Sequence, residues 1–205
     1  MNRFPPRRAG MLPAAFLLLV FQSTAQAHLA VEGAGEIGNG ALHPLVSPAH
    51  VMILLGLGLL LGQRVPFDLK KPMLVFAPAS ALALLLSTTG KIAGVPLPVL
   101  IGIALCAAIT VALGRRPPLP IVGLICTAAA VGIGLDSRVE SGTAMAIAKT
   151  LIGTWLSMNA VVAYTAICAS NGADKEWARI GIRVVGSWII AISLLVLAFS
   201  LRKSG

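Results

Sequence analysis

The chain has 205 residues, of which 57% are hydrophobic and only 11% are charged, and its formal net charge is +9. An ordinary soluble domain carries about 25% charged residues, so a chain this poor in charge cannot cover a water-facing surface. The composition therefore excludes an ordinary soluble domain and predicts an integral membrane protein. The basic residues lie mostly between apolar runs, which indicates membrane topology rather than nucleic-acid binding.

Residues 1–27 predict a cleaved signal peptide. The basic start MNRFPPRR precedes the apolar run MLPAAFLLLVF, and the AQA that ends at Ala27 is an A-x-A cleavage site. The apolar run is too short to span a bilayer, which needs about 20 residues. Cleavage would make His28 the mature N-terminus, and an uncleaved anchor is the alternative.

Six apolar runs follow, each bounded by turn or charge signals such as GRRPPLP and SNGADKEWAR. No loop between them is long enough for a soluble domain. Residues 28–205 are therefore predicted to form a single all-α domain, a polytopic bundle of about six transmembrane helices. The predicted spans are 47–63, 73–90, 97–113, 119–135, 144–168 and 180–201.

The loop charges predict the orientation in the bilayer. A cleaved signal leaves the N-terminus in the periplasm, which makes the first, third and fifth loops cytoplasmic. These loops hold most of the basic residues, as the positive-inside rule requires of a bacterial inner-membrane protein. The basic residues of the three loops are Arg64, Lys70, Lys71, Arg115, Arg116, Lys175 and Arg179.

The chain has three histidines, and all of them lie between residues 28 and 50. Ser47 followed by Pro48 predicts a hydroxyl at a helix N-cap and a proline at the first helical position, so His50 falls in the first turn. An unbroken helix would separate the rings of His43 and His50 by ~10.5 Å along its axis. Because Pro44 disfavours helix at the preceding residue, we expect His43 on an extended approach that folds back toward His50.

These side chains are candidate metal ligands. Imidazole suits nickel, copper and zinc, and a cleaved His28 would add its free amine. Asp136 and Glu140 follow the fourth run on the same expected side, and their spacing would put them on one helix face if that helix continued. The alternatives are that His43 anchors the chain at the interface and that the two acidic residues only solubilise a loop.

Lys149 is an ionisable residue one to two turns into the fifth run. A fixed positive charge at this mouth would repel a metal cation, unless the lysine pairs with Asp136 or Glu140. Snorkelling to the interface is the alternative. Within the first run, Gly56 and Gly58 are expected to allow close approach of neighbouring helices.

The stretch GALHPLVSPAHVMILLGLGLLLGQ resembles the first transmembrane signature of the HupE/UreJ family. Members are small membrane proteins, associated with hydrogenase and urease gene clusters, that are regarded as nickel or cobalt permeases. The family's motif is His-x5-Asp-His, followed by a Met-containing, Gly-rich helix. His43, His50 and Met52 match this motif, whereas Ala49 stands in place of the aspartate.

A second family motif, a His- and Gly-rich stretch that ends in Glu, is partly recognisable as GLDSRVE. Gly134 and Glu140 fit this motif, but Ile133 and Ser137 stand where histidines are expected. The resemblance therefore implies a divergent member with a changed ligand set.

The resemblance implies secondary uptake of a divalent transition metal, nickel before cobalt, in support of urease or hydrogenase maturation. The metal would be cargo, and no cofactor is implied. The sequence contains no phosphate-binding loop and no hydrolase motif, so we expect neither an ATP-driven pump nor an enzyme. The candidate metal ligands are His43, His50, His28, Met52, Asp136 and Glu140.

Two other functions stay open on the sequence alone. The histidines could bind copper or nickel at the periplasmic surface and deliver it to a partner. Alternatively, the chain could be a structural membrane subunit that has lost the ancestral ligands, as the residues at the unmatched motif positions suggest. A homo-oligomer, or partners in metalloenzyme maturation, would be compatible with each function.

Overall fold

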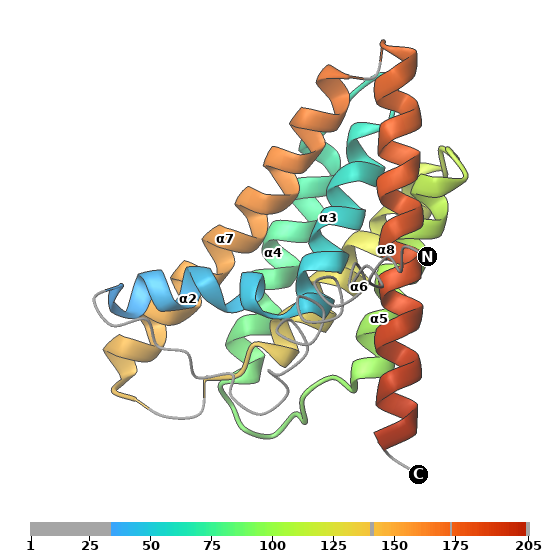
Figure 1. Cartoon of the computed structure of the whole chain (residues 1–205). Coiled ribbons are helices and arrows are strands. Elements are labelled where there is room, and N and C mark those ends of the chain that lie inside the picture. The colour runs from blue at the N-terminus through green and yellow to red at the C-terminus, as the bar shows by residue number, and fades with distance from the viewer. Residues whose placement is uncertain (1–33, 140–141, 173, 204–205) are drawn as a thin grey trace, which may run out of the picture.

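The computed structural model describes residues 34–139, 142–172 and 174–203. These residues form seven α-helices and no strand, which confirms the all-α prediction. The predicted signal peptide, His28 and Glu140 lie outside the described residues. The helices are α2 (Gly35–Val46), α3 (Pro48–Gly62), α4 (Lys70–Ser87), α5 (Leu97–Ala112), α6 (Leu119–Asp136), α7 (Ala144–Asn171) and α8 (Glu176–Lys203) (Figure 1).

A helix occupies each of the six predicted apolar runs, and its ends lie within four residues of the predicted bounds. Four helices, α4, α6, α7 and α8, are long and apolar enough to cross a membrane. The bent pair of α2 and α3 counts as a fifth if it forms one span, and α5 is apolar but has only 16 residues. Four to five candidate spans are therefore present in the described part, and six spans stay a prediction.

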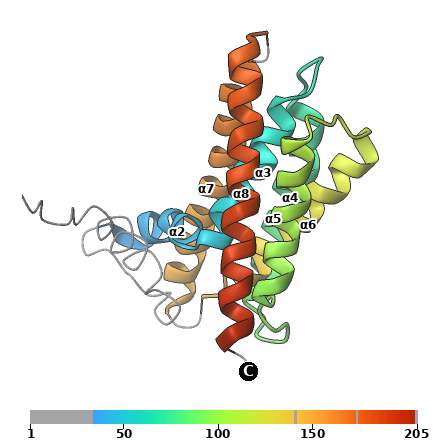
Figure 2. The same ribbon diagram turned by 45° about the vertical axis from the view of Figure 1, so that its right-hand side comes forward.

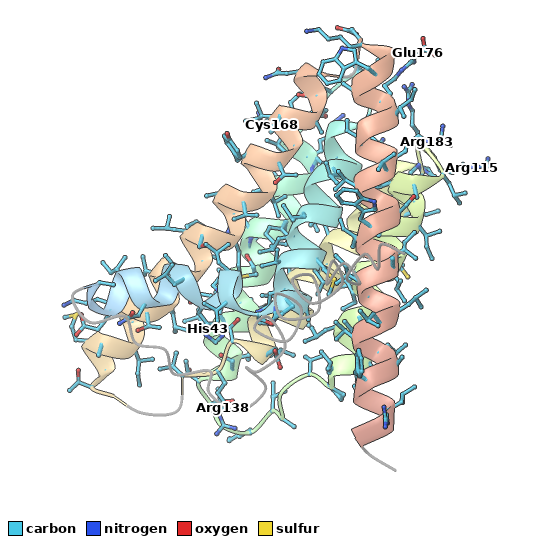
Figure 3. All side chains as sticks on the ribbon, in the orientation of Figure 1. His43, Arg115, Arg138, Cys168, Glu176 and Arg183 are labelled. Carbon is cyan, nitrogen blue, oxygen red and sulfur yellow. The ribbon has the colours of Figure 1, made fainter. Side chains whose placement is uncertain are left out.

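Helices α3 to α8 run alternately up and down, so their connections gather at two ends of the bundle (Figures 1 and 2). We call the end with the start of α3 and the end of α6 the histidine end. The opposite end, with the 63–69, 113–118 and 172–175 connections, is the basic end. Figure 3 shows His43 and Arg138 at the first and Arg115 and Glu176 at the second.

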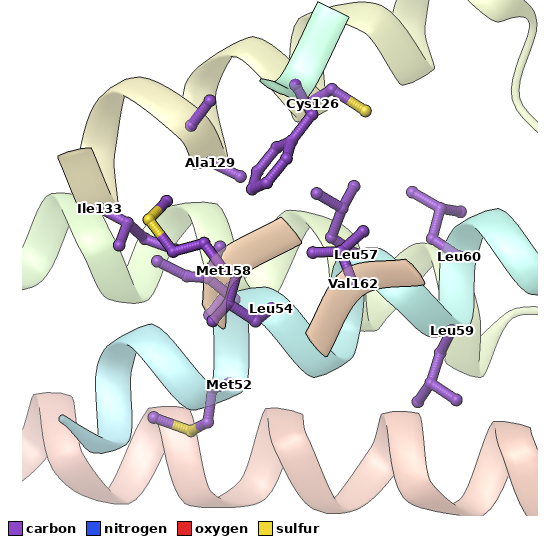
Figure 4. Close-up of a cluster of buried hydrophobic side chains, with 14 of the residues drawn as sticks. Met52, Leu54, Leu57, Leu59, Leu60, Cys126, Ala129, Ile133, Met158 and Val162 are labelled. Atoms are coloured by element: carbon purple, nitrogen blue, oxygen red, sulfur yellow. The ribbon is translucent and has the colours of Figure 1, made fainter. Parts of the chain in front are cut away.

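Helix α3 lies at the centre, in contact with α5, α6, α7 and α8. Its sequence is apolar on every face, which is typical of a fully buried helix, and most of its residues are buried. Figure 4 shows part of the resulting cluster. A Cβ atom at Gly58 would lie 2.6 Å from Cβ of Thr165 on α7, and one at Gly56 would lie 3.3 Å from Cβ of Ala107 on α5. These glycines therefore allow the close packing that their positions predicted.

Helix α2 packs along α7 and is bent by 81° from α3 (Figure 2). The expectation that His43 lies on an extended approach is therefore wrong, because α2 includes both His43 and Pro44. Pro44 cannot donate to the carbonyl of Gly40 four residues earlier. The hydroxyl of Thr154 on α7 donates there instead, sharing its single hydrogen between the carbonyl of Gly40, at 2.9 Å, and that of Thr150, at 3.0 Å. A neighbouring helix thus supplies the hydrogen bond that the proline removes.

Candidate functional site

The bend between α2 and α3 sets the position of His50. Ser47 has extended dihedral angles (φ −82°, ψ 114°), as expected for a residue that precedes a proline, and Pro48 is the first residue of α3. His50 is therefore in the first turn of α3, as predicted. Ser47 is the N-cap residue, as predicted, but its side chain makes no cap hydrogen bond.

The same bend brings the two imidazole rings together. The ring centroids of His43 and His50 are 6.0 Å apart, and the ring planes are inclined by 54°. An unbroken helix would have placed the rings ~10.5 Å apart along its axis. The single extended residue Ser47 therefore brings the two imidazole rings close together at the histidine end.

Asp136, the last residue of α6, pairs with His50. Nε2 of His50 lies 2.9 Å from Oδ2 of Asp136, and His50 is almost fully buried, with a side chain that is 2% exposed against 30% for Asp136. An ionised carboxylate only accepts, so Nε2–H of His50 is the donor. In the neutral ring this leaves a lone pair on Nδ1, which is buried and has no hydrogen-bond partner among the described residues.

The helical continuation that would have put Asp136 and Glu140 on one face does not occur. Helix α6 ends at Asp136, and Ser137 leaves the helical conformation (φ −85°, ψ 46°). Ser137 is buried, and its hydroxyl donates to the carbonyl of Ile133 at 2.8 Å. Ile133 itself lies in the apolar core (Figure 4). Both positions where the resemblance predicts histidines therefore face the protein interior.

Met52 lies on a different face of α3 from His50, since two residues correspond to about 200° around a helix. Its side chain extends toward α8 (Figure 4), where the hydroxyl of Ser193 donates to the Met52 sulfur at 3.3 Å. The structure thus brings His43, His50 and Asp136 together and leaves Met52 apart. No group of three or more His, Cys, Asp or Glu side chains suited to a metal ion occurs within the described ranges.

Lys149 pairs with Glu36 of α2, with Nζ 3.9 Å from Oε2, and both side chains are about half exposed. Of the two partners considered for Lys149, Asp136 pairs with His50 instead, and Glu140 lies outside the described residues. Glu36 and Thr154 were missed by the sequence reasoning. Glu36 belongs to α2, and Thr154 forms a hydrogen bond to it. In the sequence, only Glu36, in the first turn, indicated a helix at this position.

Comparison with known proteins gives one match. Residues 16–196 match the family described as HupE / UreJ protein. Neither the curated proteins nor the solved structures that were compared include a match to this chain.

Proposed function

We propose that this chain, which belongs to the HupE/UreJ family, imports a divalent transition metal ion, nickel before cobalt, across the bacterial inner membrane. Members of the family are permease-like accessory proteins, associated with nickel or cobalt uptake for urease and hydrogenase. The proposed transport is secondary. Inward movement of a divalent cation gains about 4.6 kcal/mol per 100 mV of membrane potential, which is twice the value for one charge.

The pairing of His50 with Asp136 is the observation that supports a metal site. Metal-ligating histidines almost always donate their other ring N–H to a carboxylate or carbonyl, which fixes the tautomer and orients the ring. His50 donates Nε2–H to Asp136 and keeps a buried Nδ1 that has no partner in the described part of the chain. In the proposed site, Nδ1 of His50 is a ligand, Asp136 orients the ring, and His43 supplies the second imidazole.

Asp136 also offers a replacement for the aspartate that the family motif places at Ala49. Ala49 is buried and carries no acceptor, whereas the carboxylate of Asp136 reaches the ring of the next residue, His50, from α6. Two imidazoles form a weak site, and conduction requires binding that is weak enough for release. His28 and Glu140 are further candidate ligands in the proposal.

The proposed orientation places the histidine end in the periplasm and the basic end in the cytoplasm. The basic end carries the positive residues of three connections, as expected for the inside of a membrane. An ion that arrives from outside would then meet His43 and His50 before the core of α3. Cleavage after Ala27, also proposed, would leave His28 on the same side.

The test is uptake of radioactive nickel and cobalt by cells that lack their own importers. The wild-type chain is compared with His43→Ala, His50→Ala and Asp136→Asn at matched membrane levels. Asp68→Asn is the control, because it removes a carboxylate at the basic end and leaves His50, Asp136 and the pair of Lys149 with Glu36 untouched. We expect uptake by the wild type and the control, and reduced uptake by the other three variants.

A structural membrane subunit is the second candidate, and the lack of a three-ligand group in the described ranges favours it. Wild-type uptake no greater than that of an empty vector would reject the permease. Unchanged function after replacement of both His43 and His50 would then support the structural role. Tight binding of nickel or copper without uptake would instead support metal delivery.

A further inference from the structure

We infer that the basic end holds a binding site for the phosphate group of an anionic phospholipid. A hollow of about 260 Å³ lies there, where the end of α3, the α5–α6 connection and the start of α8 meet. Three guanidinium groups and one carboxylate line it, which gives the lining a net charge of +2. Its lining includes Gln63, Gly114, Arg116, Glu176, Arg179 and Arg183.

Arg183 is fixed in place by the end of α5. Its Nε donates to the carbonyl of Ala112 at 2.9 Å, and a carbonyl in the last turn of a helix has no partner within that helix. Gly114, in the left-handed region (φ +63°), lets the chain turn beside the guanidinium. The terminal Nη groups of Arg183 remain as donors, and guanidinium groups bind phosphate through paired N–H donors.

The other two arginines of the hollow are available to a ligand. Within the described residues, the side chains of Arg116 and Arg179 make no hydrogen bond or ion pair. Nε2 of Gln63 donates to the carbonyl of Val111 at 3.3 Å, while its Oε1 is buried and lacks a partner among the described residues. The hollow thus offers cationic donors for a phosphate.

A second hollow indicates a lipid rather than a free phosphate. It measures about 230 Å³, shares Ile180 and Arg183 with the first, and continues along α8 past Val184 to Ser187. Ile180 and Val184 are exposed apolar residues, 55% and 44% exposed. An acyl chain would cover this surface, whereas an inorganic phosphate would leave it bare. Basic pockets between membrane helices on the cytoplasmic side bind anionic headgroups in this way.

The site also explains an arginine within a long apolar helix. Arg183 is the eighth residue of α8, about 10 Å from the first along the axis. Figure 3 shows Arg183 on the side of α8 that faces the α5–α6 connection. A charge at this depth is costly unless it is paired, and a lipid phosphate would pair with it. This inference does not depend on which ion the protein carries.

The test is native mass spectrometry of the purified full chain, titrated with phosphatidylglycerol and, separately, with phosphatidylcholine. The variant Arg116→Gln/Arg179→Gln removes two exposed guanidinium groups from the hollow. Each basic residue near the membrane surface contributes about 1 kcal/mol, so we expect roughly 30-fold weaker phosphatidylglycerol binding at the tightest site. The control Lys70→Gln/Lys71→Gln removes the same charge from the same end, outside the hollow, and should change binding by less than about 3-fold.

Two further measurements separate a lipid from a free phosphate. Val184→Trp, which fills the second hollow, should weaken the tightest lipid binding and leave any binding of inorganic phosphate unchanged. Displacement of phosphatidylglycerol by millimolar inorganic phosphate would overturn the lipid assignment. Equal affinity for the two lipids, or an equal loss in the Lys70→Gln/Lys71→Gln control, would overturn the site itself.

Discussion

Replacement of Asp136 separates the structural from the functional role of the His50 pair. Asp136→Ala leaves Nε2–H of His50 without its acceptor, in a residue that is only 1% exposed. An unsatisfied buried donor costs about 1–3 kcal/mol. Because the Asp136 side chain is 30% exposed, water reaches the vacated position and partly replaces the acceptor. We therefore expect a loss in the free energy of unfolding nearer to 1 than to 3 kcal/mol.

Asp136→Asn has nearly the same shape and can still accept from Nε2 through its amide oxygen. We expect it to lose less than about 1 kcal/mol of stability, since one neutral hydrogen bond replaces a charge-assisted one. The amide no longer enforces the tautomer that leaves a lone pair on Nδ1 of His50. Loss of such a supporting group typically lowers metal affinity 10- to 100-fold. At limiting nickel, uptake should fall by at least about 10-fold.

The measurements are the free energy of unfolding in mixed micelles titrated with sodium dodecyl sulfate, and initial uptake rates at limiting nickel. Both are compared across the wild type, Asp136→Ala and Asp136→Asn. A large loss of uptake with little loss of stability in Asp136→Asn is the expected pattern. Unfolding energies of Asp136→Ala equal to those of the wild type would refute the hydrogen-bond reasoning. Full uptake by Asp136→Asn would refute the role of the carboxylate in holding the ring.

Three further predictions concern α2 and its contact with α7. Thr154→Val leaves the Gly40 carbonyl without its donor and should lower the free energy of unfolding by about 1–3 kcal/mol, whereas Thr154→Ser, which keeps the hydroxyl, should lose less. Gly153→Ala would place a methyl group against the α2 backbone and should lower the free energy of unfolding by about 1–3 kcal/mol. Gly102→Ala, where the space is open, should leave the free energy of unfolding unchanged or raise it by up to ~1 kcal/mol in the same titration. Glu36→Gln breaks a half-exposed ion pair and should change the unfolding energy by at most about 1 kcal/mol, so a larger loss would show that the pair holds α2 in place.

The long helices could be predicted because their signals are local. Apolar runs of sufficient length, bounded by proline and glycine, fix where α3 to α8 begin and end to within a few residues. Helix α2 could not be predicted in this way. A proline within a helix argues against it, and the compensating hydroxyl of Thr154 lies 114 residues away from Gly40. A signal that depends on a distant neighbour is not visible in a local pattern.

Like the fold, the candidate site could be predicted only in part. Loop topology placed His43, His50 and Asp136 at one end of the bundle, because alternate connections of an up-and-down bundle share a side. The contact between His50 and Asp136 spans 86 residues and depends on where α6 ends. Glu140 was grouped with Asp136 through a helical spacing, but α6 does not extend beyond Asp136.

The central helix α3 and its neighbour α5 are shorter than α7 and α8, and this difference bears on how the bundle spans a membrane. Helix α3 has 15 residues and α5 has 16, so they are about 22 and 24 Å long, whereas α7 and α8, with 28 residues each, are about 42 Å long. The hydrocarbon layer of a bilayer is about 30 Å thick. Helix α3 alone is therefore too short to cross that layer, and it does so only if α2, which is bent by 81° from it, belongs to the same span.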